Sequence, residues 1–421
     1  MIHIEKLSLK NVGRYSWQTF VDHLLGSKST RVHILEKKKI NESRTFINTD
    51  ILSPYVFPKL KNVSIGKYYG MDGADIDLLL ATDPKIENLI IEISVENINS
   101  LPKQKIKVLL EKYPVMLNDF EECGTLYGPP NAHLIDILSS LNIKPKMLFL
   151  VGSCFQLHDY PELNIYKIPF EYWAVSTAVI DGVFSEIIFD SDKKQKFIDI
   201  LEKELPTKFC SIPLFKPRVN RVELLTVLDQ NGILQHTDWS LAYNLLKHNY
   251  GNTVRYKIRE PYTDAQRQFL EKYDFPKFIE GPMEHWQDLI SPHADWFNKY
   301  NFSVCAETYM GDEIPTPMGG CGALTEKTYK SFLNGSSPIM YGPIGSVSHL
   351  ESYGFKIFTG EFDSTNPHEV CSLLCELYNN PVYNTEHKIH NFQLLSNLDF
   401  LTGLVCEPLE KIAELINSIR R

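Results

Sequence analysis

The chain has 421 residues, a length that favours two domains over one, and a formal net charge of −9. Hydrophobic residues make up 43% and charged residues 23%, which is typical of a soluble globular protein, and the acidic balance argues against a protein whose main task is to coat nucleic acid. The eight cysteines include no C-x-x-C pair, so we expect reduced thiols, no zinc site and a cytoplasmic protein. We also expect no signal peptide and no membrane contact, because the sequence has no apolar run of about 18 residues.

Strand and helix patterns alternate over the first two hundred residues. Apolar or β-branched runs predict strands, and apolar residues at helical spacing predict helices; the clearest are strands at 88–97, 115–120 and 146–153 and helices at 100–114 and 192–205. Such alternation is typical of a parallel sheet with helices on both faces. Pro206 interrupts the pattern, and we place a domain boundary near it.

A second alternation follows the boundary. A strand after residue 208 leads to a helix at 219–230 that Gly232 ends. Residues 302–358 then read as strand, helix, strand, helix and strand, with helices at 325–334 and 346–353 and a last strand at 355–358. Residues 250–300 show weak periodicity and give no clear prediction. The final segment has an apolar stripe that predicts a helix over 408–420.

A Thr-Glu-Lys cluster, residues 325–327, lies where a glycine-containing loop meets a predicted helix. Thr325 suits the N-cap, and the free amides and positive dipole end of the helix suit a diphosphate. Lys327 adds a positive charge, and Glu326 offers two acceptors for vicinal ribose hydroxyls. The same residues also suit an ordinary helix start with a solvated lysine, and no strict phosphate-binding fingerprint is present. The local pattern leaves both interpretations open.

The stretch as a whole resembles the nucleotide-sugar domain of GT-B glycosyltransferases. The residues that carry the resemblance are "FSVCAET", a loop, "LTEKTYKSFLNGSSPIMYGPIGSVSHLESYGFKIF" and "FDS". A Glu before the loop, then Thr-Glu-Lys and a Pro-containing strand with a glycine turn, are similar to α-1,3-fucosyltransferases and more similar still to GT-B-like proteins of phages and marine microbes. The resemblance covers about 208–363. It departs from fucosyltransferases in the loop length and at "KSFLNGSSP", which leaves the sugar open.

The resemblance implies an α/β protein of the GT-B fold, with two Rossmann-like domains facing each other across a cleft. Residues 1–205 would form the acceptor-binding domain, residues 206–400 the nucleotide-sugar domain, and residues 401–421 a closing segment. The helix in that segment would either cross back to brace the N-terminal domain or pack in the core of the second.

The resemblance also implies roles for individual residues. Lys327 and the helix start at Thr325 would hold the diphosphate, and Glu326 the ribose. Glu307 would contact the donor sugar or order the loop. Arg218 and Arg221, which follow the first strand of the same domain, would pair with phosphate oxygens. We expect a nucleotide-sugar donor, UDP-linked rather than GDP-linked, with no cofactor and no metal.

The acceptor side is less defined by the sequence. A catalytic base must follow a strand in the N-terminal domain, and we favour Asp72 and Asp119, although each also suits an ordinary turn or cap.

Residues 208–259 hold eight basic against three acidic residues, with interleaved aromatics. This composition favours binding of either duplex DNA or the donor diphosphate. Phage enzymes that glycosylate 5-hydroxymethylcytosine in DNA, with glucose or arabinose, share the GT-B fold. We therefore predict such an enzyme, with glycan synthesis and non-catalytic nucleotide binding as alternatives; the oligomeric state stays open.

Overall fold

A computed structural model of the chain describes residues 68–71, 90–94, 102–119, 142–152, 161–169, 190–214, 217–243, 246–249, 252–255, 262–279, 296–307, 324–360 and 362–397, with isolated positions between 138 and 175 and after 398. These residues divide into two compact units. The first takes in the described residues before 180 and after 398, and the second takes in the others.

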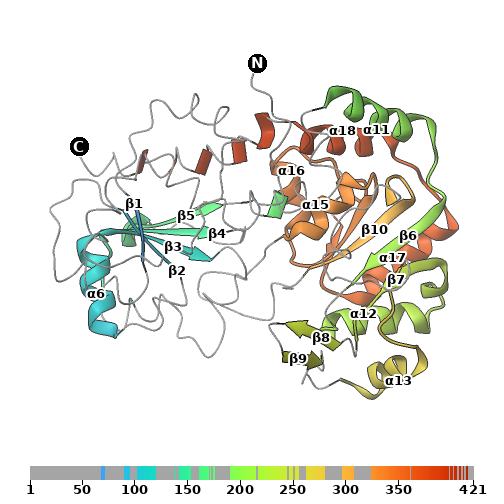
Figure 1. The fold of residues 1–421 in the computed structure, drawn as a ribbon, viewed down its shortest axis with the longest axis horizontal. Helices are drawn as coiled ribbons and strands as arrows, with labels where there is room; N and C mark the ends of the chain where they lie inside the picture. Colours follow the sequence, from blue (N-terminus) through green and yellow to red (C-terminus); the bar gives the residue numbers. More distant parts are fainter. Residues whose placement is uncertain are drawn as a thin grey trace. The chain divides into compact units, whose positions relative to one another are not determined.

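The first unit contains a parallel five-stranded sheet whose strands follow one another in chain order (Figure 1). The strands are β1 (Tyr68–Met71), β2 (Ile90–Ser94), β3 (Pro114–Asp119), β4 (Met147–Gly152) and β5 (Ile165–Pro169). Helix α6 (Lys103–Lys112) precedes β3 and buries Ile106, Leu109 and Leu110, which lie on one face at helical spacing. A short 3-10 helix, η2 (Pro161–Leu163), precedes β5.

The second unit contains another parallel five-stranded sheet, with the order β12-β11-β10-β6-β7. Its strands are β6 (Lys208–Pro213), β7 (Thr237–Ser240), β10 (Tyr300–Ala306), β11 (Ser337–Tyr341) and β12 (Asp363–Ser364). The chain leaves β6 toward β7 on one side and later enters β10 on the other side, from which it continues outward to β11 and β12. The neighbours β6 and β10 thus form a topological switch point, and open α/β sheets bind ligands at the carboxyl ends of such strands.

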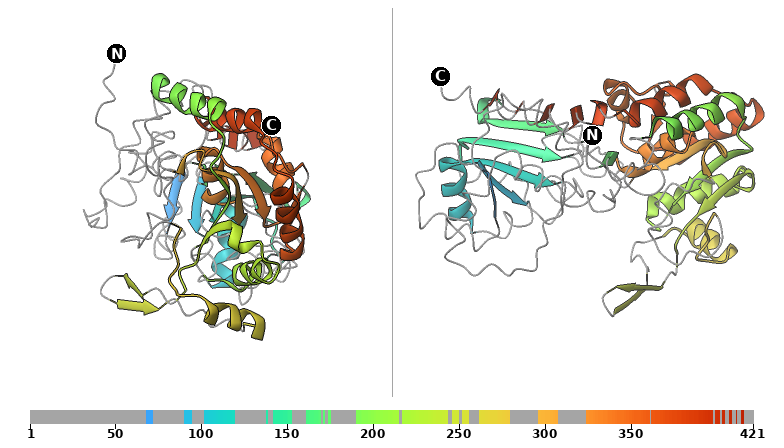
Figure 2. Two further views of the ribbon diagram at one scale, coloured as in Figure 1. Left: turned by 90° about the vertical axis from the view of Figure 1, so that its right-hand side faces the viewer. Right: turned by 45° about the horizontal axis from the view of Figure 1, so that its top comes forward.

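Helices cover both faces of this second sheet (Figure 2). The helices α12 (Val219–Gln230), α13 (Asp264–Lys272) and α17 (Pro367–Asn379) share a hydrophobic core with Phe302 and Val304 of β10. Successive residues of a strand point to opposite faces, and Cys305 contacts the carbonyl of Lys327 in α15. The other face therefore carries the helices that pack with α15 (Glu326–Leu333), namely α18 (Thr385–Leu395) and, through it, α11 (Ser191–Lys203).

Two smaller elements complete the second unit. Helix α16 (Ser346–Ser352) connects β11 to β12, and the 3-10 helix η3 (Leu234–His236) leads into β7. The strands β8 (Leu246–Asn249) and β9 (Asn252–Arg255) pair antiparallel and form a two-stranded sheet of their own (Figures 1 and 2).

The predicted α/β class with two Rossmann-like units is confirmed. The C-terminal segment returns to the first unit, as a helix that crosses back would, because the ammonium of Lys411 donates to the carbonyl of Lys167 in β5 at 2.8 Å. Most of the predicted helix 408–420 lies outside the described residues. None of the helices in the described part of the chain combines the length and apolar composition that a membrane span requires.

Two expectations differ from the structure. Helix α11 belongs to the second unit, where Phe197 stacks on Phe392 of α18, so the units divide before α11 whereas the sequence placed the boundary near 206. The strand predicted over 355–358 is wrong: Phe355 stacks on Phe332 of α15 instead. The backbone of Lys356 bonds to a side chain instead of to a neighbouring strand. Its N–H donates to Oδ1 of Asn391 at 2.8 Å, and its carbonyl accepts from Nδ2 of Asn391 at 2.7 Å.

Candidate functional site

The start of α15 lies at the carboxyl end of β10, beside the switch point. Thr325 is the N-cap residue, in extended backbone, and its hydroxyl accepts a hydrogen bond from the backbone N–H of Lys327 at 3.5 Å. Ser, Thr, Asp and Asn favour this position because their side-chain oxygens satisfy an amide that the helix itself leaves free. The predicted helix start is therefore present at the predicted residue.

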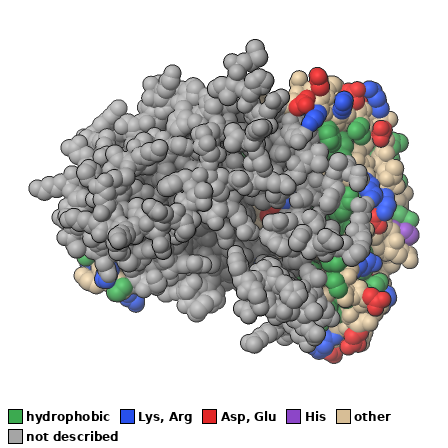
Figure 3. Space-filling view, in the orientation of Figure 1, with side chains coloured by type: hydrophobic (Ala, Val, Ile, Leu, Met, Phe, Trp, Pro, Cys, Tyr) green, Lys and Arg blue, Asp and Glu red, His purple; other side chains and the backbone are tan. Residues whose placement is uncertain are grey.

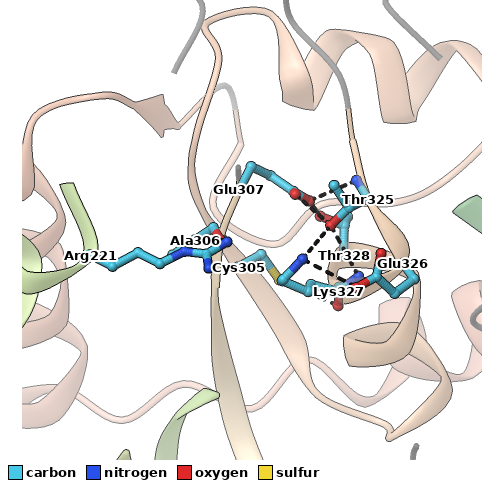
Figure 4. Close-up of polar contacts among 8 residues, drawn as sticks. All are labelled: Arg221, Cys305, Ala306, Glu307, Thr325, Glu326, Lys327 and Thr328. Carbon is cyan, nitrogen blue, oxygen red and sulfur yellow. Dashed lines mark hydrogen bonds and ion pairs between the residues drawn. The ribbon is translucent and has the colours of Figure 1, made fainter. Parts of the chain in front are cut away.

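Glu307 follows β10 directly and is 0% exposed. One carboxylate oxygen, Oε1, accepts from the backbone N–H of Thr325 at 3.1 Å and from the hydroxyl of Thr328 at 2.6 Å. The other, Oε2, accepts from the hydroxyl of Thr325 at 2.6 Å (Figure 4). A carboxylate in this place also interacts favourably with the helix dipole. Of the two roles expected for Glu307, these contacts favour ordering the chain at the helix start over contacting a sugar.

Gly342, just after β11, lies behind Glu307. A Cβ atom at this position would be 3.1 Å from Cβ and 3.2 Å from Cγ of Glu307, so the close approach requires glycine. The sequence marked Gly342 only as the first residue of a glycine turn into a helix, residues 342–346, that could shape the same pocket, and it gave no sign of Thr328. The sequence features that could have indicated them are weak. Gly342 is a glycine after a strand, and Thr328 is a threonine in the first turn of a helix, next to residues that are buried.

The glycine turn after β11, residues 342–346, does not leave the start of α16 free. The carboxylate of Asp363 accepts from the backbone N–H groups of Gly345 and Val347, both at 3.0 Å. The beginning of α16 is therefore occupied by a carboxylate of the same chain.

Glu326 and Lys327 form a partly buried ion pair at the start of α15. The ammonium of Lys327 lies 3.2 Å from Oε1 of Glu326 and 3.0 Å from the hydroxyl oxygen of Thr325, and the two charged side chains are only 13% and 21% exposed. Burial raises the pKa of Glu326, but the ammonium groups of Lys327 and Lys330 outweigh it and bring the pKa down to about 2. The first turn of α15 thus already holds an ionised carboxylate at neutral pH.

The predicted arginines begin α12 at the carboxyl end of β6. Arg218 occupies the N-cap position and is half-buried. Arg221 is 2% exposed, and its Nη2 donates to the carbonyl of Ala306, the last residue of β10, at 3.1 Å (Figure 4). Burial and, to a smaller extent, the charge of Arg218 lower the pKa of Arg221 to about 10, against the opposing effect of the carboxylates of Glu307 and Glu326. These cations and carboxylates therefore lie in one electrostatic neighbourhood.

The structure brings the predicted donor-binding residues together at one edge of the second sheet. They come from two segments that are far apart in the chain, since Arg221 and Ala306 are separated by 85 positions. The predicted bases belong elsewhere: Asp119 ends β3 in the first unit, opposite Gly152 of β4, and Asp72 lies outside the described residues. Roles for Asp72 and Asp119 stay predictions.

The basic region predicted at 208–259 is partly neutralised. Lys208 forms an ion pair with Asp238, and Arg221 is buried. Basic and acidic side chains are interspersed over the described surface of the second unit (Figure 3), and some pair with each other, as Lys203 does with Asp199. In the described part of the chain, no group of three or more His, Cys, Asp and Glu residues is arranged to hold a metal ion.

Comparisons with known proteins add little to this geometry. No family model matches the sequence, and no curated protein matches it significantly. Among solved structures, the chain is similar to the UDP-GlcNAc 2-epimerase of Neisseria meningitidis, crystallised with UDP-GlcNAc, at 10% identity and a TM-score of 0.39. The match covers 97% of this chain and 96% of that one. A likeness of this degree carries no conclusion about activity.

Proposed function

We propose that the protein is a glycosyltransferase that takes its sugar from a nucleotide-diphosphate donor. One observation supports this above the others: charged residues predicted to bind such a donor come from two distant segments and meet at the carboxyl ends of β6 and β10. This is the switch point of the second sheet, the place where open α/β sheets bind nucleotides. An ordinary helix start would not require the arginines of α12 beside it.

The donor would bind by replacing one anion with another. In the structure the carboxylate of Glu326 lies against the ammonium of Lys327 at the positive end of α15. The diphosphate takes that place, and the carboxylate of Glu326 then accepts hydrogen bonds from the two ribose hydroxyls. Arg218, half-buried at the start of α12, pairs with phosphate oxygens.

Two of the predicted residues would act through others rather than on the donor. Glu307 is fully buried and positions Thr325 and the first turn of α15. Arg221 ties the start of α12 to the end of β10 and so sets the distance between the two helix starts. Both would be positioning residues. For Arg221 this role replaces the phosphate contact that the resemblance implied, and for Glu307 it is one of the two roles expected.

The transfer step then needs a base and a stabilised leaving group. A carboxylate, for which Asp72 and Asp119 stay the candidates, takes the proton of the acceptor hydroxyl as its oxygen bonds to the anomeric carbon. The bond from that carbon to the diphosphate breaks, and Lys327 and Arg218 stabilise the negative charge on the leaving nucleotide. We propose UDP as the nucleotide and the hydroxymethyl group of 5-hydroxymethylcytosine in DNA as the acceptor, with glucose or arabinose as the sugar.

A thermal-shift screen tests donor binding. At a ligand concentration of 100 times its Kd, a nucleotide that binds only the folded protein stabilises it by about 2.7 kcal/mol. We expect UDP or a UDP-sugar to raise the melting temperature of the wild type, and Glu326→Ala and Lys327→Ala to reduce that shift. Lys203→Ala, which removes an exposed lysine of α11, serves as the matched control. If no nucleotide diphosphate or nucleotide sugar stabilises the wild type, the proposal fails.

Turnover tests the acceptor. Release of UDP that requires DNA containing 5-hydroxymethylcytosine supports the proposed enzyme. Release that requires a glycan and ignores DNA places the protein among glycan-building transferases. Binding of UDP without release on any acceptor identifies a non-catalytic nucleotide-binding module, and either of these results overturns the proposed acceptor.

A further inference from the structure

The start of α12 carries positive charge where a helix favours negative charge. Arg218 occupies the N-cap position without a side-chain cap, and the first turn contains no acidic residue. The amide of Arg221 in this turn donates to the neutral Oδ1 of Asn220 at 2.9 Å. The two arginines are close enough for the charge of Arg218 to contribute to the lowered pKa of Arg221. Because the amino end of a helix disfavours cations, the helix alone does not account for this arrangement.

Two tyrosine hydroxyls hold this turn from other elements. The hydroxyl of Tyr262, which lies just before α13, donates to the carbonyl of Pro217 at 2.6 Å. The hydroxyl of Tyr341, the last residue of β11, donates to the carbonyl of Asn220 at 3.1 Å. These bonds span 45 and 121 positions of the chain. They fix the backbone on both sides of Arg218.

The convergence of the two bonds separates them from ordinary satisfaction of a buried hydroxyl. A buried tyrosine hydroxyl usually finds an acceptor somewhere, and Tyr273 shows the ordinary case, because it donates to Asp229 near the other end of α12 at 2.6 Å. The bonds of Tyr262 and Tyr341 instead meet in one short turn, which Arg221 also ties to the end of β10. Three separate parts of the second unit thus hold the backbone around one exposed edge of its sheet.

We propose that Tyr262 and Tyr341 are positioning residues for donor binding and act through Arg218. With the carbonyls of Pro217 and Asn220 held, the guanidinium of Arg218 meets the phosphate oxygens from a fixed backbone, which reduces the conformational freedom lost on binding. In this role neither tyrosine needs to touch the donor. The inference rests on the proposed function, in which Arg218 pairs with the diphosphate.

Calorimetric titration with UDP tests the role, with Tyr273→Phe as the matched control for Tyr262→Phe and Tyr341→Phe. Each variant loses one bond from a tyrosine hydroxyl to the chain at one end of α12. All three should therefore lose some stability, and titration well below every melting temperature keeps that loss out of the measured Kd. We expect the Kd for UDP to rise about three- to tenfold in Tyr262→Phe and Tyr341→Phe, the effect of about one hydrogen bond, and to stay within about twofold of wild type in Tyr273→Phe. An equal rise in all three variants would overturn the role.

A double-mutant cycle with Arg218→Ala distinguishes positioning of Arg218 from a general effect on the fold. If the tyrosines act through Arg218, Tyr262→Phe and Tyr341→Phe should leave the Kd for UDP unchanged once residue 218 is alanine. The same rise in Kd in that background contradicts the proposal. Wild type that binds UDP no better than its two phenylalanine variants refutes the positioning role and leaves the donor site standing. Wild type that does not bind UDP overturns the donor site and this inference together.

Discussion

Replacing Glu307 by Gln tests the buried contacts that set up the site. The substitution keeps the shape of the side chain and removes its charge. In the wild type, Oε1 accepts from the N–H of Thr325 and the hydroxyl of Thr328, and Oε2 accepts from the hydroxyl of Thr325. Glutamine keeps one acceptor oxygen for the first pair. Its amide group faces the hydroxyl of Thr325 as a donor, so that hydroxyl loses its acceptor.

The expected cost follows from the number of contacts. A hydrogen bond to a charged group contributes about 1.5–3 kcal/mol, and a neutral one about 0.5–1.5. One bond is lost and two fall from charged to neutral strength, so we expect Glu307→Gln to lower the free energy of unfolding by about 3.5–6 kcal/mol. Glu202→Gln, at an exposed position on α11, should change it by less than about 0.5 kcal/mol.

Urea unfolding of Glu307→Gln, Thr328→Val and the double variant gives the coupling between the two residues. Thr328 is 0% exposed, and valine keeps its shape, so the cycle isolates the 2.6 Å hydrogen bond. We expect a coupling energy of about 1 kcal/mol or more, together with a weaker thermal shift by UDP in Glu307→Gln. No coupling, and a stability equal to that of wild type, would refute the view that Glu307 holds the start of α15.

Three other substitutions test neighbouring features by urea unfolding. Gly342→Ala should lower the free energy of unfolding by about 1–3 kcal/mol, because its Cβ would be 3.1 Å from Glu307. The pKa of Glu326 is about 2, below its ordinary 4.5, so the ionised carboxylate stabilises the fold fully above pH 4.5 and loses this effect as pH falls toward 2. The free energy of unfolding of wild type should therefore exceed that of Glu326→Gln by at most about 3 kcal/mol above pH 4.5, and the difference should shrink toward pH 2. Lys388 is 5% exposed, and burial lowers its pKa to about 7 from 10.5. The wild type should therefore gain stability relative to Lys388→Met as pH rises from 7 to 10.5, by at most about 5 kcal/mol.

A flat difference between wild type and variant across the stated pH range would contradict either titration. For Gly342→Ala, unchanged stability would show that Glu307 can move away from the new methyl group at no cost. Lys203→Ala and Glu202→Gln, both on the exposed side of α11, provide the background for all three comparisons.

Local signals in the sequence predicted much of the second unit. Helix α12 ends before Gly232, whose φ of 73° favours glycine, and Thr325 caps α15 as expected. The sequence also contains a local signal for α13, because Thr263 and Gln266 form a capping box at its start. The analysis by periodicity gave no prediction for this region. Boundaries that depend on one or two residues could thus be read from the chain.

Features that depend on distant parts of the chain could not be predicted. Glu307 bonds Thr328 across 21 positions, and Arg221 bonds Ala306 across 85, so no spacing rule connects them. The apolar run at 355–358 has the composition of a strand, but stacking of Phe355 on Phe332 and the bonds from Asn391 decide its conformation. Likewise, the division before α11 follows from its packing on α18 rather than from Pro206.

The energetics of the site argue for a ligand rather than for stability. Ionised groups are costly to bury, and well-packed apolar residues in their place are often as stable or more so. The second unit nevertheless withdraws Arg221, Glu307 and much of the Glu326–Lys327 pair from water at the carboxyl edge of its sheet. An ordinary helix start needs only Thr325 and solvated charges. Under the proposed function, the charges held at this switch point would supply partners for the diphosphate and the ribose, and the Glu326–Lys327 pair would open as the donor binds.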